Sequence, residues 1–290
     1  MIEFKAIESK HRDKYEELLS ASGIVSSEYS FLGVWGWREP ERSEIYFDEN
    51  ICWLKNRRGI LSPICKPGQD WGKIIPEYFT EGVELNDVPE GLALELSSLK
   101  GAQIKELRSE WEYVYLVKDL IELKGRSYSQ KRAHIKVYNE KYVNEYSPLL
   151  EEDFKELLIF QREWLERNKS RIAESVLCDE NKAIMSVLEH WNDFPLFGAC
   201  VRIDGRIAAY TIAEELSHET IDIRFEKAFS EYEGIYQYLN KTFLTRQGKN
   251  YIWVNREEDM GDEGLRKAKS SYHPARYEKK YLVSIPPQNC

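Results

Sequence analysis

The sequence predicts an α+β fold in which mixed, mostly antiparallel sheets are flanked by helices. Two observations lead to this prediction. Short segments rich in β-branched and aromatic residues, bounded by turn signals, alternate with segments in which apolar residues recur every three or four positions. The order of the first half (helix, antiparallel strands, helix, strand) also recurs in the second half. The helical pattern breaks at 144–148, so we expect two domains, 1–145 and 146–290.

Turn signals divide the first half into a helix, a meander and a run of alternating elements. Residues 10–22 have the apolar spacing of an amphipathic helix. The polar turns at 48–50 and 56–59 separate three short strands that form a β-meander. The expected elements are helix 10–22, strands 45–47, 51–55 and 59–65, helix 71–80, strand 92–96, helix 100–108, strand 112–117 and helix 127–143.

The second half contains a stronger hairpin signal. Asp204-Gly205 joins two apolar, β-branched segments, which predicts a two-residue β-hairpin turn. The expected elements are helices near 154–165 and 183–191, strands 196–203, 206–214 and 219–225, helix 235–243, strand 251–254, helix 262–270 and strand 277–285. Because the halves share element order without obvious sequence identity, the pattern suggests a tandem of two related domains.

The charge of the chain is unevenly distributed. The net charge is −9, yet segment 118–141 has seven Lys and Arg residues against three acids, and segment 266–280 has six against one. Two basic segments in an acidic chain indicate a focused anion site rather than a broad nucleic-acid surface. The alternative is that they are two solvated basic helices on separate faces.

Bulk features exclude several classes of protein. No apolar segment approaches the ~18 residues of a membrane span, and the N-terminus does not resemble a signal peptide. The cysteines are odd in number and scattered, which favours reduced thiols and a cytoplasmic location. They are Cys52, Cys65, Cys178, Cys200 and Cys290. The histidines show no metal-ligand spacing, so we expect no metal site.

The segment 251–274 is the most informative part of the chain. An apolar strand at 251–254 ends in a polar cluster at 255–259, and Gly261 and Gly264 bracket a turn. Asp262 then serves as the N-cap of a short basic helix, which Pro274 ends. Ligands of α/β proteins are commonly bound where a strand ends in polar groups before a helix N-terminus. The alternative is a surface turn with solvated charges.

Together with an upstream segment, this pattern resembles a known family. The upstream segment is Asp119-Leu-Ile-Glu-Leu-Lys-Gly-Arg-Ser-Tyr-Ser-Gln-Lys-Arg-Ala-His-Ile135. The two motifs, in this order, resemble those of soluble proteins related to the C-terminal domain of phosphatidylglycerol lysyltransferase (DUF2156). Ala133 stands where the family usually has Asn, so a contact made by that amide is absent here. The resemblance implies a tandem GNAT (acyl-CoA N-acyltransferase-like) fold over essentially the whole chain.

The resemblance also implies an acyl- or aminoacyltransferase, but the usual acyl-CoA site looks degraded. GNAT enzymes that use acyl-CoA bind its pyrophosphate on a glycine-rich loop after the fourth strand. The corresponding segment here, 225–234, has one glycine and three acids, which would repel pyrophosphate. Phosphatidylglycerol lysyltransferase and Fem-type enzymes use aminoacyl-tRNA instead, and the two basic segments would suit a tRNA acceptor end.

By resemblance, candidate functional residues fall into two groups. The catalytic candidates are Glu226, for amine recognition or proton transfer, and Asp259. The substrate-binding candidates are Lys124, Gly125, Arg126, Arg132, His134, Tyr236, Asn240, Asn255, Arg256, Glu257, Arg266, Lys267 and Lys269. We expect their cleft where the motifs 119–135 and 251–274 meet. The alternative for each charged turn is a structural role in capping or solvation.

Three functions stay open at this point. The first is transfer of an aminoacyl group from tRNA to an amine or hydroxyl acceptor, which could be a small molecule or lipid-like. The second is an acyl-CoA-dependent N-acyltransferase with an atypical phosphate loop. The third is a non-catalytic GNAT-like module that binds an anionic ligand. Apart from aminoacyl-tRNA or acyl-CoA as co-substrate, the sequence indicates no cofactor.

Overall fold

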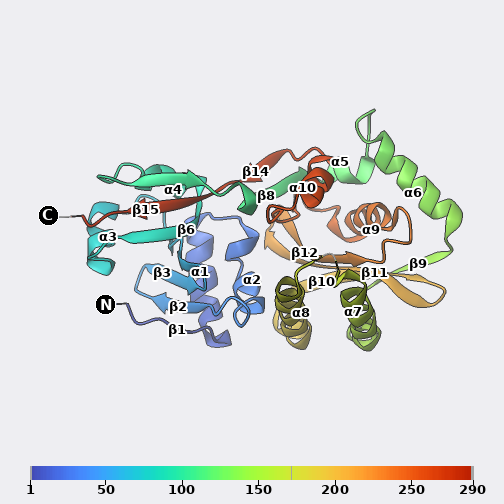
Figure 1. Cartoon of the computed structure of the whole chain (residues 1–290), viewed down its shortest axis with the longest axis horizontal. Helices are drawn as coiled ribbons and strands as arrows, with labels where there is room; N and C mark the ends of the chain where they lie inside the picture. Colours follow the sequence, from blue (N-terminus) through green and yellow to red (C-terminus); the bar gives the residue numbers. More distant parts are fainter. Residues whose placement is uncertain (1, 171, 289–290) are drawn as a thin grey trace. The chain divides into compact units, whose positions relative to one another are not determined.

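A computed structural model describes residues 2–170 and 172–288 (Figure 1). The contacts of the folded chain divide it into two compact units. Unit 1 comprises 1–112, 258–266 and 277–290, and unit 2 comprises 113–257 and 267–276. The chain passes from one unit to the other at 112/113, 257/258, 266/267 and 276/277. The two GNAT-like domains with the bounds 1–145 and 146–290 stay a prediction.

Unit 1 is built on a mixed sheet with the strand order β1-β2-β3-β4-β6-β15-β7, and β5 pairs with β3. The expected meander is present, since β2, β3 and β4 pair antiparallel in sequence. Strand β4 then pairs parallel with β6. The strands are β1 (Lys5–Ala6), β2 (Glu44–Phe47), β3 (Ile51–Asn56), β4 (Gly59–Leu61), β5 (Ile64–Cys65), β6 (Val83–Pro89), β7 (Gln103–Glu106) and β15 (Lys280–Ile285). The helices are α1 (Arg12–Ser22), α2 (Phe31–Gly36), α3 (Trp71–Tyr78) and α4 (Glu90–Leu96).

Two elements expected in unit 1 are wrong. Residues 92–96 form the end of helix α4 rather than a strand, because Ala93 and Leu96 both face the core while Leu94 is 68% exposed. A short apolar segment fits either period, and the strand lies just before it, in β6. Residues 103–106 form strand β7 rather than a helix. All four are exposed, so backbone pairing with β15 at the sheet edge holds this strand rather than an apolar pattern.

Unit 2 is built on a sheet with the order β14-β8-β13-β12-β11-β10-β9. Asp204 and Gly205 both have positive φ, at 51° and 74°, and form the predicted hairpin between β10 and β11. The strands are β8 (Glu112–Leu116), β9 (Asn144–Pro148), β10 (Leu196–Ile203), β11 (Arg206–Ser217), β12 (Thr220–Ala228), β13 (Trp253–Asn255) and β14 (Arg276–Glu278). The helices are α5 (Val117–Glu122), α6 (Ser129–Lys141), α7 (Phe154–Asn168), α8 (Glu174–Glu189), α9 (Ile235–Phe243) and α10 (Glu263–Ser270).

Segment 144–148 follows the end of helix α6 and was not expected to be a strand. It forms β9, which pairs antiparallel with β10. Its residues are partly exposed and include Pro148, which is tolerated because β9 is the edge strand of this sheet. Helices α7 and α8 cover one face of the sheet, and α5, α6 and α9 cover the other (Figure 1). Of the expected second-half elements, only the single strand 277–285 is divided, into β14 and β15.

Candidate active site

The candidate site of unit 2 begins where two parallel strands separate. Strands β12 and β13 pair in parallel over Thr220–Asp222 and Trp253–Asn255. Strand β12 continues to Ala228, whereas β13 ends at Asn255. Beyond this point, side chains rather than backbone groups connect the two segments. Arg224 Nη1 lies 2.9 Å from Glu257 Oε1, and Arg256 Nη2 lies 2.8 Å from Glu226 Oε1.

The Glu226–Arg256 ion pair is mostly buried, and one polar atom of each partner makes no hydrogen bond among the described residues. The side chains of Glu226 and Arg256 are 11% and 14% exposed. Glu226 Oε2 and Arg256 Nη1 are buried and have no hydrogen-bond partner within the part of the chain that the structure describes. Burial lowers the pKa of Arg256, but the Glu226 carboxylate more than offsets this, so the guanidinium stays charged. Unpaired buried polar groups are costly, so they mark a place prepared for a polar ligand.

Two further buried polar groups belong to the same face of the sheet. Thr211 on β11 is the cross-strand partner of Glu226, and its Oγ1 has no partner among residues 2–170 and 172–288. Asn240 Nδ2 on α9 also has no hydrogen-bond partner among the described residues, and Asn240 is 1% exposed. Tyr236 Oη hydrogen-bonds with Ala228 N and O, which anchors α9 on β12, and Asn240 lies one turn further along the helix, about 5.4 Å away.

The two sequence motifs meet beside this pair. Lys131 Nζ on α6 donates to Ser271 Oγ at 2.6 Å, and Tyr128 Oη donates to the backbone oxygen of Tyr272 at 3.0 Å. Lys131 Nζ and the Arg256 guanidinium lie 3.9 Å and 5.1 Å from the centroid of the Tyr272 ring. Burial, with a smaller contribution from Arg256, lowers the pKa of Lys131 to about 8. Burial raises the pKa of Tyr272 to about 12.

Several of the predicted residues shape this site rather than line it. The side-chain oxygen of Asn255 accepts from the backbone N–H of Glu257 at 2.9 Å, and Lys269 Nζ donates to Arg256 O at 2.6 Å. Glu257 has a φ of 56°. Together these contacts hold the turn that presents Arg256, while Glu257 itself pairs with Arg224. Tyr236 likewise binds the backbone of β12.

Of the candidates in the upstream motif, Lys124, Gly125 and Arg126 lie on a turn before α6, Arg132 is an exposed residue of α6 and His134 is a half-buried one. Lys124 is 78% exposed and pairs with Glu122, and Arg126 is also exposed. Gly125 has a φ of 85°, which favours glycine in this turn. Arg132 Nη1 donates to Leu123 O and Gly125 O, so it closes the turn. Their predicted role in phosphate binding stays a prediction.

Asp259 and Arg266 form a compact network in unit 1. The Asp259 carboxylate is fully buried and accepts from Arg266 Nε and Nη2, each at 2.8 Å, from Arg108 Nη1 at 3.1 Å and from Gly261 N at 2.9 Å. A bidentate arginine contact of this kind orients both partners firmly. Lys267 is exposed in unit 2. The catalytic role of Asp259 stays a prediction, and the proposal below does not depend on it.

Four backbone N–H groups in and beside the loop between β12 and α9 already have backbone partners. N–H groups of the loop donate to backbone oxygens as follows: Phe229 to Ala208, Tyr232 to Phe229, Glu233 to Glu231 and Ile235 to Tyr232. Glu231 pairs with Arg167, and Glu233 with Lys141 at 2.7 Å. A Cβ at Gly234 would collide with the backbone oxygen of His134, so this glycine permits helix packing. These contacts occupy some of the backbone N–H groups that a pyrophosphate would need, and they pair two of the three acids of segment 225–234 with cations of α6 and α7.

The sequence did not single out Thr211, Lys131, Ser271 or Tyr272 as site residues. Thr211 lies in an apolar strand and gives no signal of its own. Lys131 stands among several basic residues, of which only burial distinguishes it. Ser271 and Tyr272 belong to the motif 251–274, so their place in it was a usable signal.

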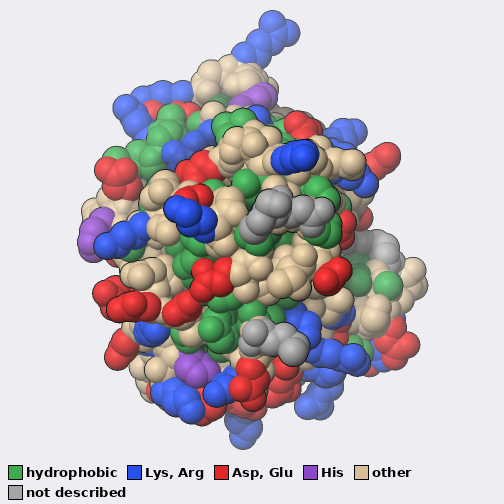
Figure 2. Space-filling model, turned by 90° about the vertical axis from the view of Figure 1, so that its left-hand side faces the viewer, with side chains coloured by type: hydrophobic (Ala, Val, Ile, Leu, Met, Phe, Trp, Pro, Cys, Tyr) green, Lys and Arg blue, Asp and Glu red, His purple; other side chains and the backbone are tan. Residues whose placement is uncertain are grey.

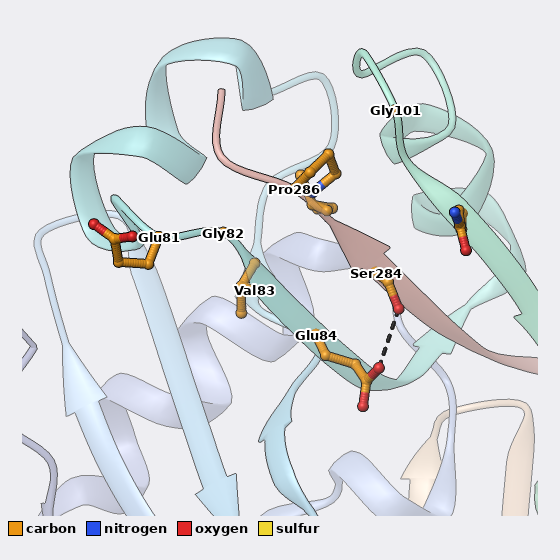
Figure 3. A pocket seen from close by; sticks show the side chains of 9 residues that line it. Glu81, Gly82, Val83, Glu84, Gly101, Ser284 and Pro286 are labelled. Carbon is orange, nitrogen blue, oxygen red and sulfur yellow. Dashed lines mark hydrogen bonds between the residues drawn. The ribbon is translucent and has the colours of Figure 1, made fainter. Parts of the chain in front are cut away.

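The hollow shown in Figure 3 is not lined by any of the candidate residues. This hollow of about 430 Å³ in unit 1 is lined by the ends of β6 and β15 and by Gly101, and Ser284 Oγ donates to Glu84 Oε2 at 3.1 Å beside it (Figure 3). On the face drawn in Figure 2, acidic and basic side chains are interspersed rather than segregated. Within the described residues, no helix is long and apolar enough to cross a membrane. Cys52, Cys65, Cys178 and Cys200 are free thiols, and Cys290 lies outside the described residues.

The fold and its relatives define the class of protein. The chain has the tandem GNAT fold: it superposes on FemX with a TM-score of 0.60 at 7% identity, covering 99% of this chain and 98% of FemX. The family profile of the phosphatidylglycerol lysyltransferase C-terminal domain matches residues 63–284. The chain belongs to this family.

Similar proteins of this group come from several bacteria. A conserved protein of unknown function from Bacteroides thetaiotaomicron is 28% identical with a TM-score of 0.88, covering 98% of this chain and all of the other. The C-terminal domain of a lysylphosphatidylglycerol synthetase from Agrobacterium fabrum is 14% identical with a TM-score of 0.67, covering 98% and 93%. An uncharacterised protein of Mycoplasmoides gallisepticum is 23% identical over 240 residues, 78% of this chain and 75% of that protein.

Proposed function

We propose that unit 2 is an aminoacyltransferase centre that takes an aminoacyl group from the 3′ end of tRNA and transfers it to an amine or hydroxyl acceptor. The observation that carries this proposal is the set of four buried polar groups without a described partner: Thr211 Oγ1, Glu226 Oε2, Asn240 Nδ2 and Arg256 Nη1. The set contains a negatively charged hydrogen-bond acceptor, Glu226 Oε2, and two donors, of which Arg256 Nη1 is positively charged and Asn240 Nδ2 is neutral.

This set complements an α-aminoacyl ester. The α-ammonium group of the ester donates to Glu226 Oε2, and the ester carbonyl accepts from Arg256 Nη1 and Asn240 Nδ2. When a nucleophile attacks the carbonyl carbon, negative charge develops on that oxygen, and fixed donors in a buried site stabilise it. The Glu226–Arg256 ion pair holds both groups in place before the ester binds.

The family supports an aminoacyl donor over acyl-CoA. The profile that matches this chain is named for a lysyltransferase. In the β12–α9 loop, the N–H groups of Tyr232, Glu233 and Ile235 already donate to backbone oxygens of the loop, and the loop has a single glycine. The exposed cations Lys124, Arg126 and Lys267 supply positive charge for the phosphates of an acceptor end. An aminoacyl-tRNA donor also requires the cytoplasmic location that the scattered cysteines favour.

Glu226→Gln is expected to weaken binding of aminoacyl-tRNA by about tenfold to a hundredfold, because a charge-assisted hydrogen bond contributes about 1.5–3 kcal/mol. Binding of uncharged tRNA is expected to stay as in the wild type, since it has no α-ammonium group. Filter binding with a panel of labelled aminoacyl-tRNAs measures this difference, and thermal shift with acetyl-CoA and longer acyl-CoAs runs in parallel.

Glu231→Gln is the matched control. Glu231 lies five residues further along the chain, is 51% exposed and pairs with Arg167. Its replacement is expected to leave the preference for charged over uncharged tRNA intact. A wild-type protein that responds to acyl-CoA and not to aminoacyl-tRNA would contradict the proposal and favour the CoA-dependent alternative.

A further inference from the structure

We propose that Lys131 is the proton shuttle of this centre, a role that rests on the proposed aminoacyl transfer. Its neutral amine takes the proton of the attacking acceptor and returns it to the leaving ribose oxygen. Lys131 stands in the first turn of α6 and is 9% exposed, whereas Gln130, Arg132 and Lys136 around it are exposed. Helix α6 therefore directs this one amine inward.

The surroundings of Lys131 favour an uncharged amine. The groups near it are Ser271 Oγ, the Tyr272 ring and the Arg256 guanidinium, which contacts the same ring. Within residues 2–170 and 172–288, Lys131 has no carboxylate partner, and the nearby charge on Arg256 is of like sign. By contrast, Lys141 at the other end of α6 pairs with Glu233, which raises its pKa. A buried lysine beside another cation is the usual way to obtain a basic amine near neutral pH.

Ser271 orients Lys131 without occupying its lone pair. The Ser271 hydroxyl donates to Ala268 O at 2.6 Å, so its proton is already in use. Ser271 Oγ can then only accept from Lys131 Nζ. A neutral Lys131 consequently donates one N–H to Ser271, and its lone pair stays available to take a proton from the acceptor.

The step is balanced without a further reactant. The acceptor N–H or O–H gives its proton to Lys131 Nζ as the acceptor atom bonds to the ester carbonyl carbon. The tetrahedral intermediate collapses, the bond between that carbon and the ribose oxygen breaks, and the Lys131 ammonium returns the proton to the ribose oxygen. Arg256 and Glu226 keep their charges throughout.

Lys131→Arg keeps a positive charge at this position but removes the group that can take up and return a proton, because arginine stays protonated. The variant is expected to bind aminoacyl-tRNA like the wild type, yet to release the aminoacyl group about 10²- to 10⁴-fold more slowly, which is the usual contribution of a general acid–base group. The probe is single-turnover release from labelled aminoacyl-tRNA with ethanolamine as surrogate acceptor, corrected for the uncatalysed rate. The wild-type rate is expected to rise with pH through about 8, as Lys131 loses its proton, and then to level off.

Two further measurements make the test decisive. Lys136→Met is the matched control, because Lys136 lies on the same helix and is 75% exposed; it is expected to keep both rate and pH profile. In protein labelled with ¹³C-lysine, one NMR signal that is missing from the Lys131→Arg variant is expected to titrate near pH 8.

The outcomes separate the shuttle from the proposed function. A Lys131→Arg variant that keeps the wild-type rate or pH inflection, or a Lys131 signal that titrates near 10.5, overturns the shuttle alone. Binding of aminoacyl-tRNA without accelerated release also overturns the shuttle and leaves the donor site standing. Absence of binding by the wild type overturns both.

Discussion

Replacing Arg224 by Met is expected to lower the free energy of unfolding by about 3–5 kcal/mol, the usual cost of removing one partner from a buried ion pair. The Arg224 side chain is 4% exposed and contacts three carboxylates: Glu214, Asp222 at 3.3 Å and Glu257 at 2.9 Å. These contacts hold the pKa of Arg224 well above its usual value, against burial, which lowers it. Without the guanidinium, the three acids repel one another in a buried site.

The loss is expected to depend on pH. In the variant, the acidic cluster has lost its cation in a largely buried place, and a proton taken up by the folded chain relieves the repulsion. The folded variant then binds more protons than the unfolded chain, so it gains stability relative to the wild type as the pH falls from neutral toward about 5. Urea denaturation at several pH values measures this, and hydrogen exchange of β11 and β12 assigns it to unit 2.

Arg206→Met is the control for the arginine replacement. Arg206 lies on the same strand pair and contacts Glu163 at 2.7 Å, but its side chain is 70% exposed. An exposed pair contributes about 0–1 kcal/mol, so little change is expected. A loss of stability of equal size in both variants, or a loss in Arg224→Met that does not vary with pH, would contradict the account of the buried network.

Replacing Lys280 by Met is expected to destabilise unit 1 by a similar amount, about 3–5 kcal/mol. Lys280 is 3% exposed, and its Nζ lies 2.8 Å from the Glu112 carboxylate and 3.8 Å from that of Glu28. Burial lowers the pKa of Lys280, but these carboxylates and Asp87 raise it well above its usual value. Glu112 also accepts from Ser26 Oγ at 2.7 Å, yet neutral donors cannot replace the lost cation.

The neighbouring lysine is the matched control. Lys279 contacts Glu90 at 2.8 Å, and the two side chains are 34% and 49% exposed. Lys279→Met removes the same number of charges and is expected to cost at most about 1 kcal/mol. Thermal unfolding of the two variants, with hydrogen exchange of β6 and β15 as the local readout, makes the comparison. Equal shifts for both would show that the burial of Lys280 does not matter.

Strongly patterned elements of this fold were predictable from the sequence. The Asp204-Gly205 hairpin and the helix at 235–243 depend on local signals, a left-handed turn and a one-sided apolar face, and the structure has both. The sequence missed strands β7 and β9 at sheet edges, and it also missed strand β6 and helices α2, α4 and α5. Edge strands are held by backbone pairing with a distant neighbour, which side-chain patterns do not report.

The candidate site also contains residues that the sequence could indicate and residues that it could not. Glu226, Arg256 and Asn240 could be selected from the sequence because the resemblance to the family directs attention to the segments that contain them. Nothing local separates Lys131 from Arg132 or Thr211 from its apolar neighbours. Their importance comes from what surrounds them in the folded chain.

By itself, the sequence determined the class of fold, the family and the two motifs that meet in unit 2, because periodicity, turn chemistry and motif order are properties of neighbouring residues. Only the tertiary structure decided which polar atoms are buried without a partner and which lysine lacks a counter-ion. Those properties depend on strands β11, β12 and β13 and helices α6 and α9, which lie far apart in the sequence. Burial and electrostatics act through space, so only the folded chain sets them.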